Sequence, residues 1–128
     1  LRNSRCSHDL RQVQRIIGGN VLLVKGYKGR AAVAAKAAHT DAIISKDKLA
    51  FNKTGNAGMT VGGTGDVLAG LCAGLLAQEK DLFKSAAAAA YVNGKAGDML
   101  LRKYGYGFTA SDLVEKLPVI LKQLLGTK

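Results

Sequence analysis

This 128-residue chain has few cysteines and no long apolar run, and both absences exclude classes of protein. Its two cysteines, Cys6 and Cys72, have neither the number nor the spacing of a disulfide framework or a zinc site, so a reducing compartment is expected. The longest apolar run, residues 67–77, is shorter than the roughly 20 residues that cross a bilayer, and no signal peptide is recognisable. With one proline and 48% hydrophobic residues, the sequence predicts a single compact domain over residues 1–128, soluble and cytoplasmic.

Aromatic residues are also scarce, at 5% of the chain, and this bears on its strong positive charge. The net charge of +10 is concentrated in residues 1–53, which hold 11 Lys and Arg residues against 3 acidic ones. Such a surplus attracts polyanions, from nucleic acids to nucleotide phosphates. Because the basic residues are not interleaved with aromatic ones, a solvated basic face is favoured over nucleic-acid binding.

The hydrophobic periodicity predicts an α/β layered protein. Residues 9–17 place apolar side chains on one helical face, and residues 21–24 have the pattern of a buried strand. Residues 41–45 and 48–52 flank a short turn and are rich in β-branched and aromatic types, which indicates a β-hairpin. Further helices are predicted over residues 30–38, 65–78, 82–104 and 111–125. Ser111 is the expected N-cap of the last helix, which Pro118 is expected to kink or split.

Five glycines precede a single acidic residue, Asp66, in the stretch NKTGNAGMTVGGTGD at residues 52–66. An apolar helical pattern follows at once, so the chain passes here from a loop into a helix. The free N–H groups at the start of a helix bind anions, and glycine lets a phosphate approach the backbone closely. The helix dipole also favours a carboxylate in the first turn, where Asp66 can accept a proton from a substrate hydroxyl. This geometry suits phosphoryl transfer to an alcohol.

The glycine-rich segment can also be compared with known phosphate-binding motifs and with purely structural roles. The segment lacks the lysine of a P-loop and the third glycine of the dinucleotide-binding fingerprint. Gly70 and Gly74, four residues apart on the following helix, are expected to permit close helix packing. A simple N-capping turn with an acidic first-turn residue stays open as an alternative to a catalytic site.

Residues 52–78, NKTGNAGMTVGGTGDVLAGLCAGLLAQ, closely resemble the signature of the ADP- or ATP-dependent NAD(P)H-hydrate dehydratases in the ribokinase-like superfamily. The resemblance continues through residues 86–98, AAAAAYVNGKAGD, and 109–121, TASDLVEKLPVIL. It implies the C-terminal part of an α/β/α layered domain, with a short sheet and hairpin followed by three helices. The N-terminal half of the family domain has no counterpart here, and Asn93 stands where the family usually has histidine.

The resemblance also implies a reaction and its participants. In the family, ADP or ATP phosphorylates the hydroxyl of hydrated NADH or NADPH, and loss of phosphate regenerates the reduced cofactor, with Mg²⁺ accompanying the nucleotide. Asp66 would be the catalytic residue and would contact the substrate. Asn56 would also contact the substrate, and a role in forming the turn is its alternative. The residues implied in nucleotide binding are Lys25, Gly26, Tyr27, Lys28, Gly62, Gly63, Thr64 and Gly65.

Two other functions stay open at this point. The chain could be an inactive or partner-dependent fragment that binds adenine nucleotide. It could also be a small-molecule kinase of the same superfamily, where the GTGD motif serves hydroxyl phosphorylation as well. In either case a sheet of few strands with several alanine-rich helices leaves an apolar face to cover, so a homo-oligomer is expected.

Overall fold

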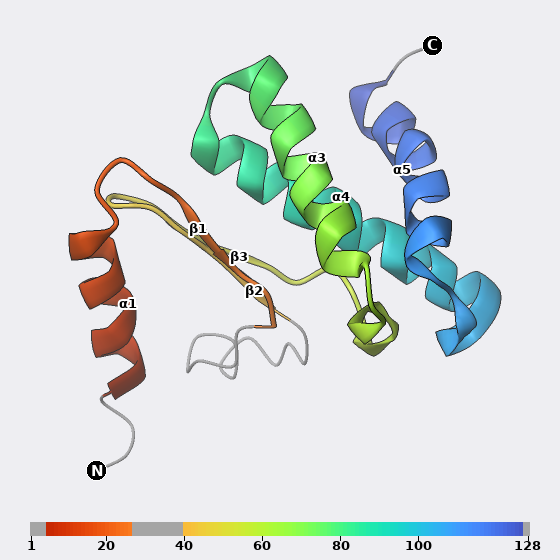
Figure 1. Ribbon diagram of the computed structural model, residues 1–128, viewed down its shortest axis with the longest axis horizontal. Coiled ribbons are helices and arrows are strands. Elements are labelled where there is room, and N and C mark those ends of the chain that lie inside the picture. Colours follow the sequence, from red (N-terminus) through yellow and green to blue (C-terminus); the bar gives the residue numbers. More distant parts are fainter. Residues whose placement is uncertain (1–4, 27–39, 127–128) are drawn as a thin grey trace.

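The computed structural model describes residues 5–26 and 40–126 of the chain. In chain order, these residues form helix α1 (Arg5–Ile16), strands β1 (Leu22–Val24), β2 (Asp41–Ile44) and β3 (Leu49–Asn52), the 3-10 helix η1 (Ala57–Thr60), helices α3 (Thr64–Glu79) and α4 (Leu82–Tyr104), the 3-10 helix η2 (Gly105–Gly107) and helix α5 (Ala110–Leu125). Figure 1 shows the strands on one side of the molecule and the three C-terminal helices on the other. This arrangement confirms the predicted fold class, a short sheet with a hairpin followed by three helices.

The three described strands form an antiparallel sheet in the order β1-β2-β3. The predicted hairpin is confirmed, since Ile43 of β2 lies opposite Ala50 of β3 and the turn is closed by a 2.9 Å hydrogen bond from Ser45 N to Lys48 O. The prediction that the first strand is buried is wrong. Among the described strands β1 pairs with β2 alone, and its Leu22 stays 41% exposed.

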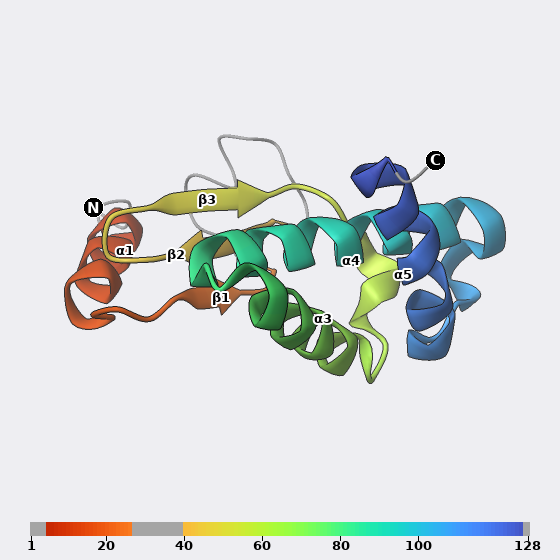
Figure 2. The same ribbon diagram turned by 90° about the horizontal axis from the view of Figure 1, so that it is seen from above.

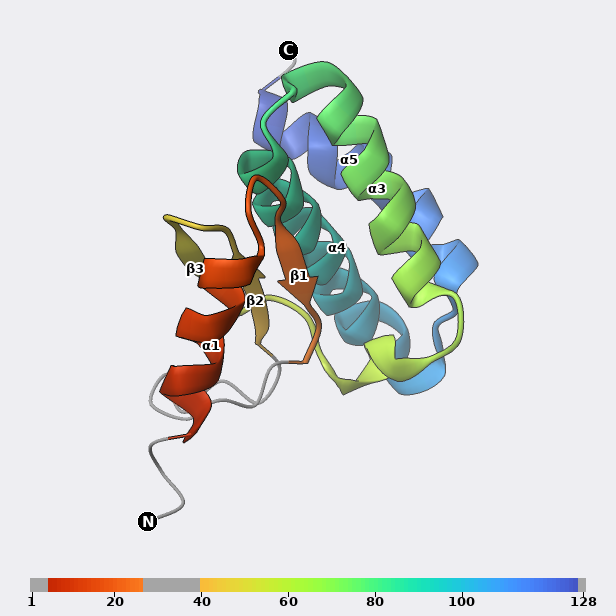
Figure 3. The same ribbon diagram turned by 60° about the vertical axis from the view of Figure 1, so that its left-hand side comes forward.

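Helix α4 lies between the sheet and the pair formed by α3 and α5 (Figure 3). In its first half, Ala86 and Ala90 form a core with Ile43 of the central strand. Because alanine side chains are small, the helix can approach the sheet closely. In its second half, Leu100 joins a separate core that includes Leu113 of α5. The helix therefore connects the sheet to the helical layer, and it can position any loop that crosses from one to the other.

The first helix lies at the end of the sheet (Figure 2), where Gln14 Nε2 donates a 3.1 Å hydrogen bond to Ser45 O. It begins at Arg5, earlier than the predicted span of residues 9–17. The helix predicted over residues 30–38 lies outside the described residues. None of the helices in the described part of the chain combines the length and apolar character needed to cross a membrane.

The start of α5 differs from its prediction. Thr109, and not Ser111, is the N-cap: its side chain accepts a hydrogen bond from Asp112 N, and Asp112 Oδ2 accepts one of 2.7 Å from Thr109 N. These two bonds form a capping box, which satisfies two of the free N–H groups at the helix start. The hydrogen bond from the Thr109 N–H lowers the pKa of Asp112. Pro118 lies inside α5 without splitting it.

Candidate functional site

The loop that leaves β3 is anchored to α4 by Asn52, a buried residue at the end of the strand. Its Nδ2 donates to Ala90 O of α4 and to Asp41 Oδ2 of β2, both at 3.0 Å. Its Oδ1 accepts from the backbone N–H of Thr54 at 3.2 Å and from the Thr54 hydroxyl at 2.8 Å. One side chain thus fixes the direction in which the loop begins.

Asp98, one turn beyond Gly94 on α4, holds the next part of the loop. Its Oδ2 accepts a 3.1 Å hydrogen bond from Gly55 N, and its Oδ1 accepts a 3.0 Å bond from Asn56 Nδ2. The other end of the Asn56 amide accepts from Gly58 N at 3.0 Å and so caps η1. The Asn56 side chain is therefore engaged in forming the turn, the alternative role that the sequence left open.

The loop lies directly on α4 because two helical positions lack side chains. A Cβ on Gly94 would lie 2.6 Å from the carbonyl carbon of Thr54, and one on Gly97 would lie 2.7 Å from Met59 Cγ. Both separations are shorter than real Cβ atoms show. Gly94 and Gly97 therefore permit the close approach that brings this loop against the helix.

The glycine turn that follows η1 opens directly into α3. Gly63 is the N-cap, with a positive φ of 90° that favours glycine. The hydroxyl of the buried Thr64 lies 2.7 Å from Met59 O and 3.1 Å from Val61 O, and it closes the turn from inside. Asp66 lies in the first turn of α3, as predicted, and its carboxylate is exposed with no hydrogen-bond partner among the described residues.

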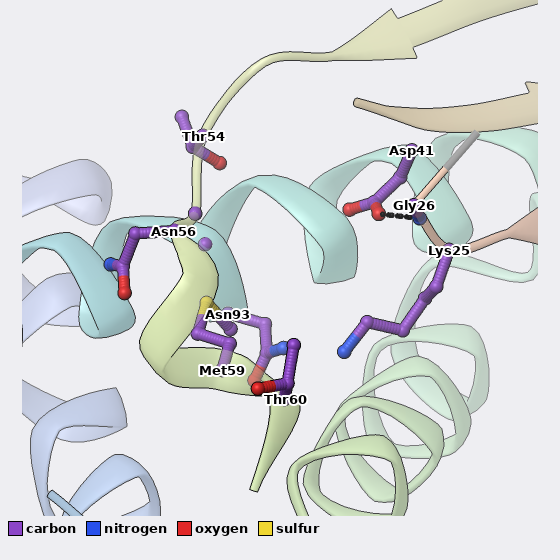
Figure 4. A pocket seen from close by; sticks show the side chains of 10 residues that line it. Lys25, Gly26, Asp41, Thr54, Asn56, Met59, Thr60 and Asn93 are labelled. Carbon is purple, nitrogen blue, oxygen red and sulfur yellow. Dashed lines mark hydrogen bonds between the residues drawn. The ribbon is translucent and has the colours of Figure 1, made fainter. Parts of the chain in front are cut away.

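A pocket of about 190 Å³ lies between the end of β1, the anchored loop and α4 (Figure 4). Gly26 is held in its wall by a 3.1 Å hydrogen bond from its N–H to Asp41 Oδ1. The side chains of Lys25, Thr60 and Asn93 converge on the pocket from three different elements. Its described lining consists of Lys25, Gly26, Asp41, Thr54, Gly55, Asn56, Met59, Thr60, Asn93 and Gly94.

The segments that form the pocket and the glycine turn also match a known protein family. The family model of the NAD(P)H-hydrate dehydratases matches residues 22–119, which include the pocket, the glycine turn and α4. This chain belongs to that family.

Two relatives show how much of a dehydratase this chain represents. The bifunctional NAD(P)H-hydrate repair enzyme Nnr of Archaeoglobus fulgidus is 45% identical over 104 residues, which cover 81% of this chain and 22% of the relative. The ADP-dependent (S)-NAD(P)H-hydrate dehydratase of Cenarchaeum symbiosum is 48% identical over 83 residues, or 65% of this chain and 29% of the relative. The chain therefore spans less than a third of the length of either relative.

A solved structure shows the fold independently. YxkO of Bacillus subtilis, a member of the UPF0031 family, superimposes with a TM-score of 0.75 over 96% of this chain and 41% of YxkO. The two sequences are 23% identical, so the likeness concerns the fold alone. It agrees with the ribokinase-like fold that the sequence resemblance implied.

In this member of the dehydratase family, the predicted site residues fall into two groups. Lys25, Gly26 and Asn56 line the pocket beside α4. Asp66 instead lines a separate groove of about 530 Å³ between α3 and α5. Between the two groups lies the turn of Gly62, Gly63, Thr64 and Gly65, whereas Tyr27 and Lys28 lie outside the described residues.

The groove beside Asp66 overturns one expectation. Gly70 and Gly74 were expected to permit close helix packing, yet a Cβ on either would meet nothing within 4 Å. Both line the groove, together with apolar side chains such as Leu71 and Leu117. In the described part of the chain these glycines face open space, so their packing role is not observed.

Sequence reasoning assigned no role to Asp98 or Asp41, although both fix the walls of the pocket. Asp98 binds a loop 43 residues away along the chain, and no local sequence pattern predicts such a contact. Among the described residues no cluster of three or more His, Cys, Asp or Glu could hold a metal ion.

Proposed function

We propose that this chain takes part in the nucleotide-dependent dehydration of hydrated NADH and NADPH, a reaction that repairs the damaged cofactor. The observation that carries the proposal is the match of residues 22–119 to the dehydratase family, because those residues include the glycine turn and Asp66. The name of the Cenarchaeum symbiosum relative supports ADP as the nucleotide. ATP is the other candidate.

The glycine turn is the proposed binding site for the phosphates. The first N–H groups of α3 have no partner within the helix, and they carry the positive end of its dipole. A Cβ on Gly62 or Gly65 would meet nothing within 4 Å, so the backbone is open to a ligand at both positions. An anion held there can accept several N–H hydrogen bonds at once.

Asp66 is the proposed proton acceptor. The hydroxyl oxygen of the hydrated nicotinamide would attack the terminal phosphorus of the nucleotide while its proton passes to the Asp66 carboxylate. The bond from phosphorus to the nucleotide's bridging oxygen breaks, and ADP leaves as AMP, or ATP as ADP. The C–O bond of the new phosphate ester then breaks as inorganic phosphate leaves, and a proton lost from the adjacent ring carbon to solvent restores the double bond of the reduced cofactor. The carboxylate, exposed in the first turn of α3 and without a hydrogen-bond partner among the described residues, is available for this role.

Lys25 is proposed to neutralise charge on the nucleotide from the opposite wall of the pocket, and Gly26 to contact it through the backbone. Mg²⁺ would accompany the phosphates, since this ion is commonly held by one or two carboxylates together with substrate phosphates. Asn56 would contact the substrate only through groups that its turn leaves free.

The chain is proposed to form the C-terminal part of a single domain and to act in the cytoplasm as a homo-oligomer. The free thiol of Cys72 fits a reducing compartment. Exposed apolar side chains along α5, among them Val114 at 52% and Leu124 at 51% exposure, support assembly. A monomer mass in light scattering at micromolar concentration would contradict it.

The function is tested by mixing the chain with hydrated NADH, Mg²⁺ and either ADP or ATP. Reappearance of the absorbance of reduced nicotinamide, dependent on the nucleotide, is the expected result. A chain that binds ADP or ATP in calorimetry but restores no absorbance with either would contradict the dehydratase proposal, and would favour a nucleotide-binding fragment.

A further inference from the structure

The pocket beside α4 contains a buried polar group that has no hydrogen-bond partner in the described part of the chain. Asn93 is 2% exposed and lines the pocket, and its Oδ1 has no hydrogen bond to any described residue. A buried acceptor without a donor loses the hydrogen bonds that water gave it, so nearly all such groups in folded proteins have a partner. A ligand in the pocket can supply the missing donor.

The size of the pocket limits what this ligand group can be. Sites for whole drug-sized molecules usually measure about 300–1,000 Å³, so a pocket of about 190 Å³ holds one ring rather than an entire nucleotide. A phosphate has only acceptor oxygens when ionised, and it cannot donate to Asn93 Oδ1. The partner must therefore carry an N–H or O–H donor, and a base with an amino group beside a ring nitrogen matches both ends of the carboxamide.

The two rings of the proposed reaction can be separated by the position of Asp66. The ring that carries the reacting hydroxyl must lie within reach of Asp66, which faces the α3–α5 groove and does not line this pocket. The base of the nucleotide carries no reacting atom. Thr60 lines the pocket and lies just before Gly62, so a base in the pocket leaves its phosphates near the glycine turn.

We propose that Asn93 is a specificity-determining residue that reads the adenine base of the nucleotide. A carboxamide pairs with adenine through two hydrogen bonds: the exocyclic amino group donates to Oδ1, and Nδ2 donates to the ring nitrogen N7. This inference rests on the proposed function for the choice of ligand, and it adds a residue that selects among nucleotides.

The test compares ADP with IDP, which carries an oxygen in place of the exocyclic amino group. On the edge that Asn93 is proposed to pair with, hypoxanthine presents two acceptors, N7 and O6, and a carboxamide has only one donor group to offer them. In calorimetric titrations with Mg²⁺ and no substrate, the chain should bind ADP more tightly than IDP by about 5- to 150-fold, the usual discrimination of such a pair. Equal affinities in the parent protein would overturn the proposal.

A pair of variants assigns the discrimination to Asn93. Asn93→Leu keeps the approximate side-chain size and removes the buried oxygen that lacks a partner among the described residues, so the fold should be kept. Its preference for ADP over IDP should disappear. Ser85→Ala is the matched control, because Ser85 is a second buried residue of α4 with an unpartnered oxygen and does not line the pocket. Its preference for ADP should be unchanged, and a preference that survives in Asn93→Leu would overturn the proposal.

The outcome is independent of the dehydratase reaction. A chain that prefers ADP through Asn93 but does not dehydrate hydrated NADH would contradict the proposed function and leave the role of Asn93 standing. A chain that dehydrates hydrated NADH with ADP and IDP equally well, and binds them equally, would support the function and contradict the role of Asn93.

Discussion

Gly94→Ala tests the close contact between α4 and the loop that forms the pocket. The new Cβ would lie 2.6 Å from the carbonyl carbon of Thr54 and 2.7 Å from its carbonyl oxygen. These are backbone atoms, so no side-chain rotation relieves the overlap and the loop must move. Because the Thr54 backbone and hydroxyl both bond to Asn52, movement of the loop also weakens these two hydrogen bonds.

The magnitude follows from three contributions. Overpacking costs about 2 kcal/mol, within the usual range of 1–3. Two weakened hydrogen bonds cost about 1 kcal/mol each. The higher helix propensity of alanine returns up to about 1 kcal/mol. The free energy of unfolding should therefore fall by roughly 3 kcal/mol, which corresponds to a melting temperature lower by roughly 10 °C for a domain of this size.

The assay is thermal unfolding followed by circular dichroism, with Gly70→Ala as the matched control. Gly70 also lies inside a helix, and a Cβ there meets nothing within 4 Å. The control should gain up to about 1 kcal/mol from helix propensity alone. If the melting temperature of Gly94→Ala is equal to or above that of the parent, the loop does not lie against α4 and does not form the wall of the pocket described above.

Three further predictions concern the cap of α5 and the anchor of the loop. Thr109→Ala should lower the free energy of unfolding by about 1 kcal/mol in denaturant titration, whereas Ser111→Ala should change it by less than about 0.5 kcal/mol; equal losses would contradict the assigned cap. The pKa of Asp112 is lowered in the folded state by its hydrogen bond from Thr109, so its contribution to stability is fully present above about pH 4, the unfolded value, and is lost as the pH falls through the folded one. The melting temperature of the parent should therefore exceed that of Asp112→Asn at pH 6, and the gap should narrow on acidification; a constant gap would count against the bond. Asp98→Asn replaces a carboxylate that accepts from Gly55 N and Asn56 Nδ2, and it should lower nucleotide affinity in calorimetry by about 10-fold at near-normal helix content, whereas unchanged affinity would show that Asp98 does not shape the pocket.

The elements with a clear period were predictable from the sequence. The predicted span of residues 82–104 coincides with α4, because its apolar residues repeat at helical spacing over many turns. The cap of α5 was only partly predictable, although Thr109 and Asp112 have the three-residue spacing of a capping box. Ser111 competes with Thr109 in sequence alone, and only the backbone geometry distinguishes them.

The pocket could not be predicted in the same way. Asp98 meets Gly55, and Asn52 meets Ala90, across 43 and 38 residues of chain, and such contacts depend on how the layers pack. The sequence does not reveal that the oxygen of Asn93 is buried without a partner among the described residues. The packing predicted for Gly70 and Gly74 was not observed for a related reason. Small residues four positions apart permit close helix packing, but whether another helix lies against them depends on the tertiary structure.

The central claim, that Asp66 accepts the proton of the substrate hydroxyl, is tested most directly by Asp66→Asn. The rate at which hydrated NADH regains its absorbance in the presence of ADP and Mg²⁺ should fall by about 10²–10⁴-fold, the usual loss of a general base. Affinity for ADP should stay level or rise, because a negative charge beside the phosphates is removed. Asp47→Asn, in the exposed hairpin turn, is the control and should keep the parental rate. If Asp66→Asn is as fast as the parent, Asp66 only caps the start of α3 and the proposed mechanism is wrong.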